Sequence, residues 1–172
     1  MSTPFLETER LTIRRLVLAD APFVFDLVND PSWLRFIGDK NVHSVADAER
    51  YLEEGSLASY RHHGFGMFLV ESKADGSPMG FCGLLQRDDL DIPDLGYALR
   101  PHFWGRGYAR EAAIAVLDWG RSTLGLDRIL AITAPDNEAS MRLLESIGFE
   151  RLPPMRPAGA DGSTDAFFAF PA

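Results

Sequence analysis

The stretch that decides the fold is a short strand that runs through a glycine-bearing loop into a helix: Asp94-Leu95-Gly96-Tyr97-Ala98-Leu99-Arg100-Pro101-His102-Phe103-Trp104-Gly105-Arg106-Gly107-Tyr108-Ala109. Gly105 and Gly107 carry no Cβ, so the backbone amides around them can turn inward together. The helix expected from Tyr108 to Thr123 adds unpaired N–H groups and the positive end of its dipole. These features predict a cradle for a phosphate or pyrophosphate group.

Two other phosphate-binding motifs fit this loop less well. A Walker loop would need a Gly-Lys-Ser/Thr run, which this segment lacks. A Rossmann fingerprint would need a small residue where Arg110 stands and would come earlier in a chain. A bare Gly-x-Gly is also typical of an ordinary turn between a strand and a helix. The loop alone therefore leaves a turn and a binding site both open.

Alternating and continuous apolar runs predict the strands. Besides 94–99, strands are expected at 11–14, 65–71, 79–86, 128–133, 149–152 and 166–170. Together with the helices, they give the order β-α-α-β-β-β-α-β-α-β-β. This order predicts a single α/β (α+β) domain over residues 1–172, built on a mixed sheet.

Capping residues and prolines predict the helix ends. Asp20 can cap a helix that ends before residue 30, because Pro31 bars its continuation. Ser44 and Asp47 resemble a capping box and open a helix over 45–60. A further helix over 137–147 is stopped by Gly148.

Composition excludes several classes of protein. The chain has 172 residues and a formal net charge of −8, which argues against a nucleic-acid partner because such proteins need a basic face. No apolar run is long enough to span a bilayer, and no signal peptide is visible. The lone Cys82 excludes an internal disulfide and fits a reducing, cytoplasmic location. The acidity would suit a cationic substrate, although it also simply favours solubility.

Three segments in a fixed order carry a resemblance to a known family. The first is the stretch quoted above with Glu111-Ala112 after it, the second is Asn137-Glu138-Ala139-Ser140 with Gly148-Phe149, and the third is the opening Thr8-Glu9-Arg10-Leu11-Thr12-Ile13-Arg14. Together they resemble the GNAT superfamily of N-acetyltransferases, and more narrowly its RimJ/RimL-like branch of ribosomal-protein N-acetyltransferases. Trp104 and Arg110 depart from the common pattern, and Arg110 puts the contacts to the cofactor's outer phosphate in doubt.

The resemblance implies acetyl-CoA (CoA) as co-substrate, no metal, and a mostly antiparallel sheet splayed at its fourth strand, Asp94–Leu99. The pantetheine arm would bond to main-chain groups of this strand and to the side chain of Asn137. The pyrophosphate would meet the amides of the glycine loop, with charge-assisted bonds from two arginines. The implied cofactor-binding residues are Tyr97, Ala98, Leu99, Gly105, Arg106, Gly107, Tyr108, Ala109, Arg110 and Asn137.

The catalytic residues implied are Ser140, which would protonate or hydrogen-bond the leaving thiolate, and Asp94, which would act as general base through a water molecule. Glu71, at the end of a central strand, is a second candidate base. His62 and His63 have a suitable pKa but fit better as charges at a helix end. Glu111 is expected to stabilise the helix dipole or a neighbouring loop.

The proposed reaction is the transfer of an acetyl group to a primary amine by direct attack. An α-amine costs roughly 1.4 kcal/mol to deprotonate at pH 7, against roughly 4.6 kcal/mol for a lysine, so a protein or peptide N-terminus is the easier acceptor. A small-molecule (antibiotic or polyamine) N-acetyltransferase and a non-catalytic acyl-CoA-binding module are the alternatives. Members of this branch are often dimers, so a homodimer is one possible state.

Overall fold

The central strands bury side chains on both faces, because helices cover both sides of the sheet. In the computed structural model, β2 (Leu11–Arg15) buries Leu11 and Ile13 fully. β3 (Met67–Ser72) and β4 (Pro78–Leu85) are buried over most of their length, as continuous apolar strands are when both faces are covered. The structure describes residues 5–160, 162 and 164–171.

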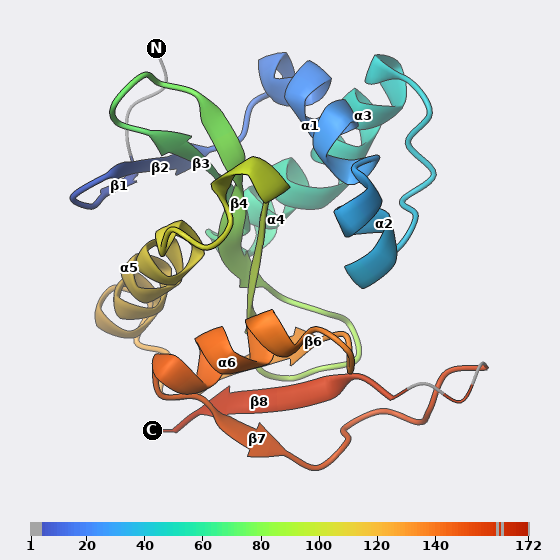
Figure 1. Cartoon of the computed structure of the whole chain (residues 1–172), viewed down its shortest axis with the longest axis vertical. Helices are drawn as coiled ribbons and strands as arrows, with labels where there is room; N and C mark the ends of the chain where they lie inside the picture. Colours follow the sequence, from blue (N-terminus) through green and yellow to red (C-terminus); the bar gives the residue numbers. More distant parts are fainter. Residues whose placement is uncertain (1–4, 161, 163, 172) are drawn as a thin grey trace.

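Within the described residues, eight strands form one open sheet in the order β1-β2-β3-β4-β5-β6-β8-β7 (Figure 1). All neighbouring pairs are antiparallel except β5 and β6, which are parallel. The mixed, mostly antiparallel sheet predicted from the sequence is thereby confirmed, and β5 is the fourth of the expected strands. The remaining strands are β1 (Leu6–Glu7), β5 (Asp94–Leu99), β6 (Ile129–Thr133), β7 (Glu150–Leu152) and β8 (Ala166–Phe170).

Two groups of helices lie on opposite sides of the sheet (Figure 1). On one side, Val24 and Leu52 pack with Phe81 of β4. On the other side, Ala112 belongs to the core cluster of Phe68. The helices are α1 (Ala21–Val28), α2 (Pro31–Phe36), α3 (Val45–Leu52), α4 (Ala58–His63), α5 (Tyr108–Ser122) and α6 (Glu138–Ser146), with short 3-10 turns at Leu18–Asp20 and Pro101–Phe103.

Two elements were not expected from the sequence, β1 and α2. Pro31 does end the first helix, but it also starts α2, because proline is tolerated in a first turn where no backbone donor is needed. Asp30 caps this helix by accepting a hydrogen bond from Ser32 N at 2.8 Å. The helix expected over 45–60 begins at its predicted cap, Ser44, and runs through a π-helical segment (Glu53–Leu57) into α4.

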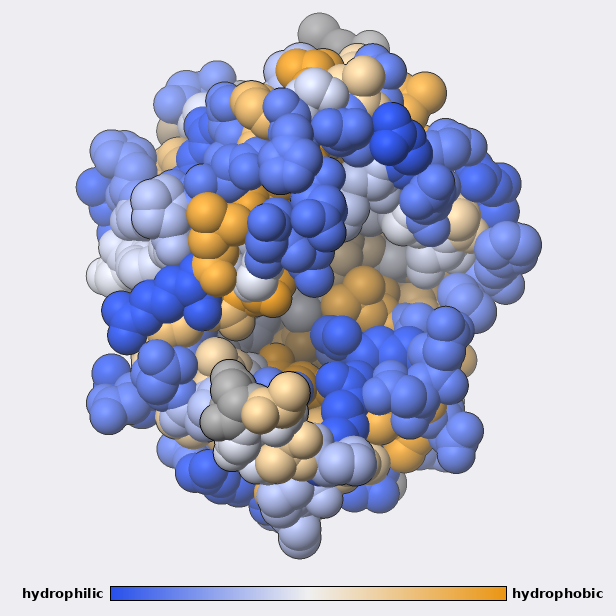
Figure 2. All heavy atoms as spheres, turned by 90° about the vertical axis from the view of Figure 1, so that its right-hand side faces the viewer, coloured by the Kyte–Doolittle hydropathy of each residue, from blue (hydrophilic) through white to orange (hydrophobic). Residues whose placement is uncertain are grey.

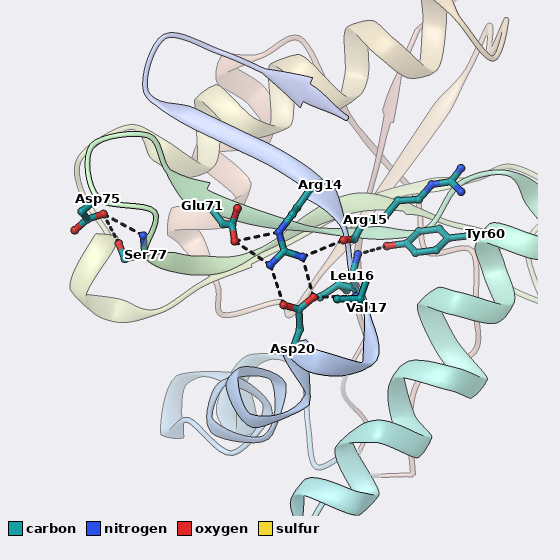
Figure 3. Close-up of polar contacts among 9 residues, drawn as sticks. All are labelled: Arg14, Arg15, Leu16, Val17, Asp20, Tyr60, Glu71, Asp75 and Ser77. Carbon is teal, nitrogen blue, oxygen red and sulfur yellow. Dashed lines mark hydrogen bonds and ion pairs between the residues drawn. The ribbon is translucent and has the colours of Figure 1, made fainter. Parts of the chain in front are cut away.

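Asp20 does not cap α1, contrary to the sequence prediction. It occupies the N-cap position without a side-chain cap bond, and its carboxylate instead pairs with Arg14 at 2.9 and 2.8 Å (Figure 3). Arg14 also donates to Glu71 at 3.0 and 2.9 Å, so one guanidinium joins β2, β3 and the start of α1. The Asp20 carboxylate pairs with Arg14 in preference to capping the helix, because a hydrogen bond between two charged groups is stronger than one to a neutral backbone amide.

We predict that Gly83→Ala destabilises the fold. A Cβ at Gly83 would lie 2.2 Å from Gly66 O, just before β3, and 2.6 Å from the Cα of Met67, the first residue of β3. The loss should be about 1–3 kcal/mol in the free energy of unfolding, measured by urea denaturation. Gly55→Ala is the matched control, since a Cβ there meets nothing within 4 Å. Equal stability of the two variants would contradict the prediction.

Candidate active site

A cavity of about 860 Å³ runs between the two helix groups and is the candidate site. Its walls include Trp33 and Tyr51 from the α1–α3 side, Tyr97 from β5, and Ala109 and Ser140 from α5 and α6. Figure 2 views the molecule from the right-hand side of Figure 1 and shows a hollow there, with hydrophobic residues in its floor and hydrophilic residues around its rim. One continuous space therefore touches the strand, the loop and both helices that the sequence singled out.

The parting of β5 from β6 opens this cavity. The two strands pair only at Asp94↔Leu130 and Leu95↔Ala131. On its other side, β5 pairs with β4 along its whole length. The divergence therefore leaves the second half of β5 with a sheet edge that has no neighbouring strand.

The register shows which main-chain groups face the open edge. Arg100 N donates to Met79 O at 2.9 Å, which fixes the register of the hydrogen bonds between β5 and β4. Because these bonds alternate along an antiparallel pair, the N–H and C=O of Ala98 point towards β4. The N–H and C=O groups of Tyr97 and Leu99 therefore point towards the open edge. Trp104 Nε1 donates to Leu99 O at 2.7 Å, which occupies one acceptor and closes the loop onto the strand. The sequence expected main-chain contacts from all three residues, and the geometry favours Tyr97 and Leu99.

The glycine loop has the backbone shape that its sequence predicted. Gly105 and Gly107 have φ angles of 70° and 79°, in the left-handed region that favours glycine. The first helical bond of α5 runs from Glu111 N to Gly107 O at 3.0 Å, so the amides of Tyr108, Ala109 and Arg110 precede the first regular donor. The N-cap, Gly107, supplies no side-chain cap. The helix start thus presents donors and a positive dipole end to the cavity.

The two loop arginines differ in position. Arg110 lines the cavity, and its Nε lies 3.4 Å from Ser146 Oγ. Arg106 is exposed and does not appear among the cavity walls, although its neighbours Gly105 and Gly107 do. Contact of Arg106 with a phosphate group stays a prediction. The backbone amide of Arg106 is better placed for this contact than its side chain.

Ser140 and Tyr97 form a hydrogen-bonded pair inside the cavity. Tyr97 OH lies 2.8 Å from Ser140 Oγ and donates to Ser140 O at 3.2 Å. Burial raises the pKa of the Tyr97 phenol, so it stays protonated at neutral pH. Asn137 Oδ1 accepts from Ser140 N at 3.1 Å and caps α6, one of the two roles that the sequence allowed it.

The side chain of Tyr97 is the part of this site that the sequence reasoning missed. The residue was expected to act through its main chain, yet its phenol spans the gap from β5 to α6. The alternation of β5 places Tyr97 on the same face as Leu95 and Leu99, which pack in the core cluster shared with α5 and α6. That alternation was the available signal, because it points the ring towards the cavity.

The candidate general bases are held in ion pairs. Asp94 lines the cavity, but it is only 1% exposed, and Arg87 donates to both of its carboxylate oxygens at 2.8 and 3.1 Å. Burial raises the pKa of the Asp94 carboxyl, although the Arg87 guanidinium opposes the shift. Glu71 lies outside the cavity walls, in the pair with Arg14. The role of Asp94 as a base therefore stays a prediction.

The two histidines lie where the sequence placed them. His62 and His63 occupy the last turn of α4, before Gly64, and neither appears among the cavity walls. A positive charge in that position suits the helix dipole.

Glu111 ties the start of α5 to the segment between β1 and β2. It accepts from Thr8 Oγ1 at 2.5 Å, from Arg10 N at 2.9 Å and from Arg10 Nε at 2.7 Å. Burial acts to raise the pKa of Glu111, but these hydrogen bonds outweigh it and hold the pKa below its usual value. The expectation that Glu111 stabilises a neighbouring loop is confirmed, and the loop is the one that carries Thr8 and Arg10.

An open edge at the fourth core strand, beside a glycine loop at a helix start, is the arrangement expected of an acyl-CoA-dependent N-acyltransferase. The chain belongs to the acetyltransferase (GNAT) domain family, whose model matches residues 10–150. It is accordingly an acetyl-CoA-dependent N-acetyltransferase.

Two kinds of relatives agree with this assignment. The chain is 32% identical over 150 residues to the uncharacterized N-acetyltransferase YoaA of Bacillus subtilis, covering 86% of this chain and 84% of that protein. An acetyltransferase from Agrobacterium tumefaciens matches with a TM-score of 0.82 and 28% identity, covering 100% of this chain and 96% of that one. RimL, a ribosomal α-N-protein acetyltransferase solved with coenzyme A, has a TM-score of 0.82 at 17% identity with 97% of each chain covered, which is a likeness of fold. The RimJ/RimL-like resemblance seen in the sequence is consistent with this neighbour.

The described part of the chain has no helix with the length and apolarity needed to cross a membrane. Its histidine, cysteine and carboxylate side chains also form no group of three or more that could hold a metal ion.

We predict that the contribution of Glu111 to stability depends on pH. Its pKa in the folded state is lowered, so its stabilisation is complete above the unfolded pKa and is lost as the pH falls through the folded value. The difference in unfolding free energy between the wild type and Glu111→Gln should be largest at pH 7 and shrink below about pH 4. Urea denaturation across this range measures it. Glu138→Gln is the control, because Glu138 pairs with Arg142 on the exposed surface of α6 and should matter little at any pH.

Proposed function

We propose that this enzyme transfers the acetyl group of acetyl-CoA to an α-amine, such as the N-terminus of a protein or peptide. The observation that carries the donor half of the proposal is that the open edge of β5 and the start of α5 line one cavity. The first suits an extended arm that bonds as an added strand, and the second suits a pyrophosphate. RimL, whose fold the chain shares, is described as an α-N-protein acetyltransferase.

The cavity residues fit acetyl-CoA in one direction. The outward main-chain groups of Tyr97 and Leu99 would bind the pantetheine, with Asn137 beside it. The amides from Gly105 to Ala109 would bind the pyrophosphate, and Arg110 would add charge. This placement leaves the α1–α3 end of the cavity, with Trp33, Phe36 and Tyr51, for the acceptor.

The proposed chemistry needs few groups from the protein. A neutral amine attacks the thioester carbonyl, a C–N bond forms and the C–S bond breaks. An outward main-chain amide of β5 stabilises the negative oxygen, and Ser140 Oγ gives a proton to the departing thiolate. Tyr97 OH, 2.8 Å from Ser140 Oγ, orients that hydroxyl, and a proton from solvent restores the serine after the thiol has left. The proton of the amine passes to solvent or, through water, to Asp94.

An α-amine is favoured because the candidate bases are already paired. Asp94 is paired with Arg87, so it is a weak base for the acceptor. The acceptor amine must therefore be neutral in a sizeable fraction of molecules before it binds. At pH 7 an α-amine with pKa about 8 is roughly one-tenth neutral, whereas a lysine at about 10.4 is neutral in fewer than about one molecule in a thousand.

Thiol release from acetyl-CoA tests the acceptor class. The panel contains peptides with free N-termini, the same peptides blocked at the N-terminus but containing lysine, a polyamine and an aminoglycoside. We expect turnover with the free N-termini, and a kcat/KM that rises about tenfold per pH unit below pH 8 and levels off above it. Turnover with the polyamine or aminoglycoside alone would support a small-molecule enzyme. Binding of CoA without turnover of any amine would support a non-catalytic module.

Replacing Ser140 and Tyr97 tests the proton donor. We expect Ser140→Ala to lower kcat about 10- to 100-fold with little change in CoA affinity, and Tyr97→Phe to lower kcat less. Because Tyr97 acts through Ser140, the double variant should be no slower than Ser140→Ala alone. Additive losses would show that Tyr97 acts independently, and an unchanged rate for Ser140→Ala would remove its role.

A further inference from the structure

Arg10 contacts the glycine loop and the first turn of α5 from outside the cavity. Its Nη1 donates to Arg106 O at 2.9 Å and its Nε to Glu111 Oε2 at 2.7 Å. Its guanidinium carbon lies 4.3 Å from the centroid of the Tyr108 ring, within cation–π range. The side chain of Arg10, just before β2, thus contacts the glycine loop at Arg106, the first residue of α5 at Tyr108, and the carboxylate of Glu111.

Gly107 separates Arg10 from the cofactor cavity. Gly107 lines both that cavity and a second hollow, whereas Arg10 lines only the second. A Cβ at Gly107 would lie 3.4 Å from Arg10 Nη2, so the guanidinium packs closely behind this residue. Arg10 is not among the residues that line the cavity, so the contact through which it can influence a group bound there is its bond to the loop backbone.

Peptide geometry supplies the coupling. Arg106 C=O and Gly107 N–H belong to one planar peptide unit, which is trans here, so the carbonyl and the N–H point in opposite directions. A guanidinium that holds Arg106 O on the outer side keeps Gly107 N–H turned away from it. The positive charge beside the carbonyl also polarises the unit and makes the N–H a stronger donor.

Glu111 fixes the guanidinium in turn. Its two oxygens accept from Arg10 Nε, Arg10 N and Thr8 Oγ1, so both the backbone and the side chain of Arg10 are anchored. Glycine residues give the loop its shape but also make it flexible, and an aimed amide needs a restraint from outside. The opening Thr8-Glu9-Arg10 segment, which has no part in the proposed chemistry, supplies that restraint.

We propose that Arg10 is a positioning residue for the cofactor: through Arg106 O, it aims the Gly107 amide at the pyrophosphate of acetyl-CoA. The inference rests on the proposed CoA site. Because Arg10 is paired with Glu111, it also keeps that carboxylate from repelling the anionic pyrophosphate. A structural tie between the N-terminal segment and α5 would instead affect stability without singling out the pyrophosphate.

The test compares ligands with and without a pyrophosphate. Arg10→Met keeps the apolar stem and removes the guanidinium, and Arg128→Met, an exposed arginine outside both hollows, is the control. Calorimetry measures the affinity for CoA, and kinetics compare kcat/KM for acetyl-CoA and for S-acetylpantetheine, which lacks the pyrophosphate. We expect Arg10→Met to weaken CoA binding about tenfold, or roughly 1.4 kcal/mol, and to raise KM for acetyl-CoA with kcat nearly kept. The values for S-acetylpantetheine and for the control should stay within about twofold of the wild type.

Two results would overturn the proposal: CoA affinity unchanged in a folded Arg10→Met, or an equal loss for S-acetylpantetheine. Circular dichroism and thermal melting establish that each variant is folded. If Arg10→Met is not folded, Arg10→Lys takes its place, because lysine keeps the charge but lacks the fork that reaches both Arg106 O and Glu111. It should weaken CoA binding several-fold and leave S-acetylpantetheine unaffected. A wild-type protein that binds no CoA would refute the proposed function itself, before any variant is compared.

Discussion

The short pairing between β5 and β6 is the constraint on which the site depends. Because the strands separate after the pairs Asp94↔Leu130 and Leu95↔Ala131, the second half of β5 keeps one edge without a neighbouring strand. A fully paired sheet would satisfy these main-chain groups internally and leave no room for an extended ligand. The same divergence brings α6 against β5, where Ser140 meets Tyr97. One backbone feature therefore creates both the space for a donor and the wall that carries a proton donor.

Electrostatics explain how an acidic chain can hold an anionic cofactor. The acidic side chains that line the cavity are paired: Asp94 with Arg87, and Asp165 with Arg156. Glu111, at the start of α5, is paired with Arg10. Each pair removes a bare negative charge from the neighbourhood of the cavity. The start of α5 then acts through its amides and dipole at short range, where the overall charge of the protein matters less because of solvent screening.

Local patterns were enough to predict most of the elements. The strand over 94–99 and the helix start at Tyr108 fall where alternation, proline and glycine placed them. The prediction that failed involves competition between partners for one side chain. Asp20 was expected to cap a helix, but Arg14 offers it a charged partner from another strand. The prediction that the first helix ends before Pro31 is confirmed, but α2, which begins at that proline, was not expected because a rule about where helices stop does not say where the next one starts.

The sequence by itself determined the shapes of the glycine loop and of the strand before it, because these shapes depend on residues a few positions apart. It also determined the family, through three motifs in order. Only the tertiary structure decided which groups meet across the chain: Tyr97 with Ser140, Asp94 with Arg87, and Arg10 with the loop around Gly107. These contacts depend on how β5, β6 and α5 pack together. A single sequence records the residues that can form such pairs but not the distances that select among them.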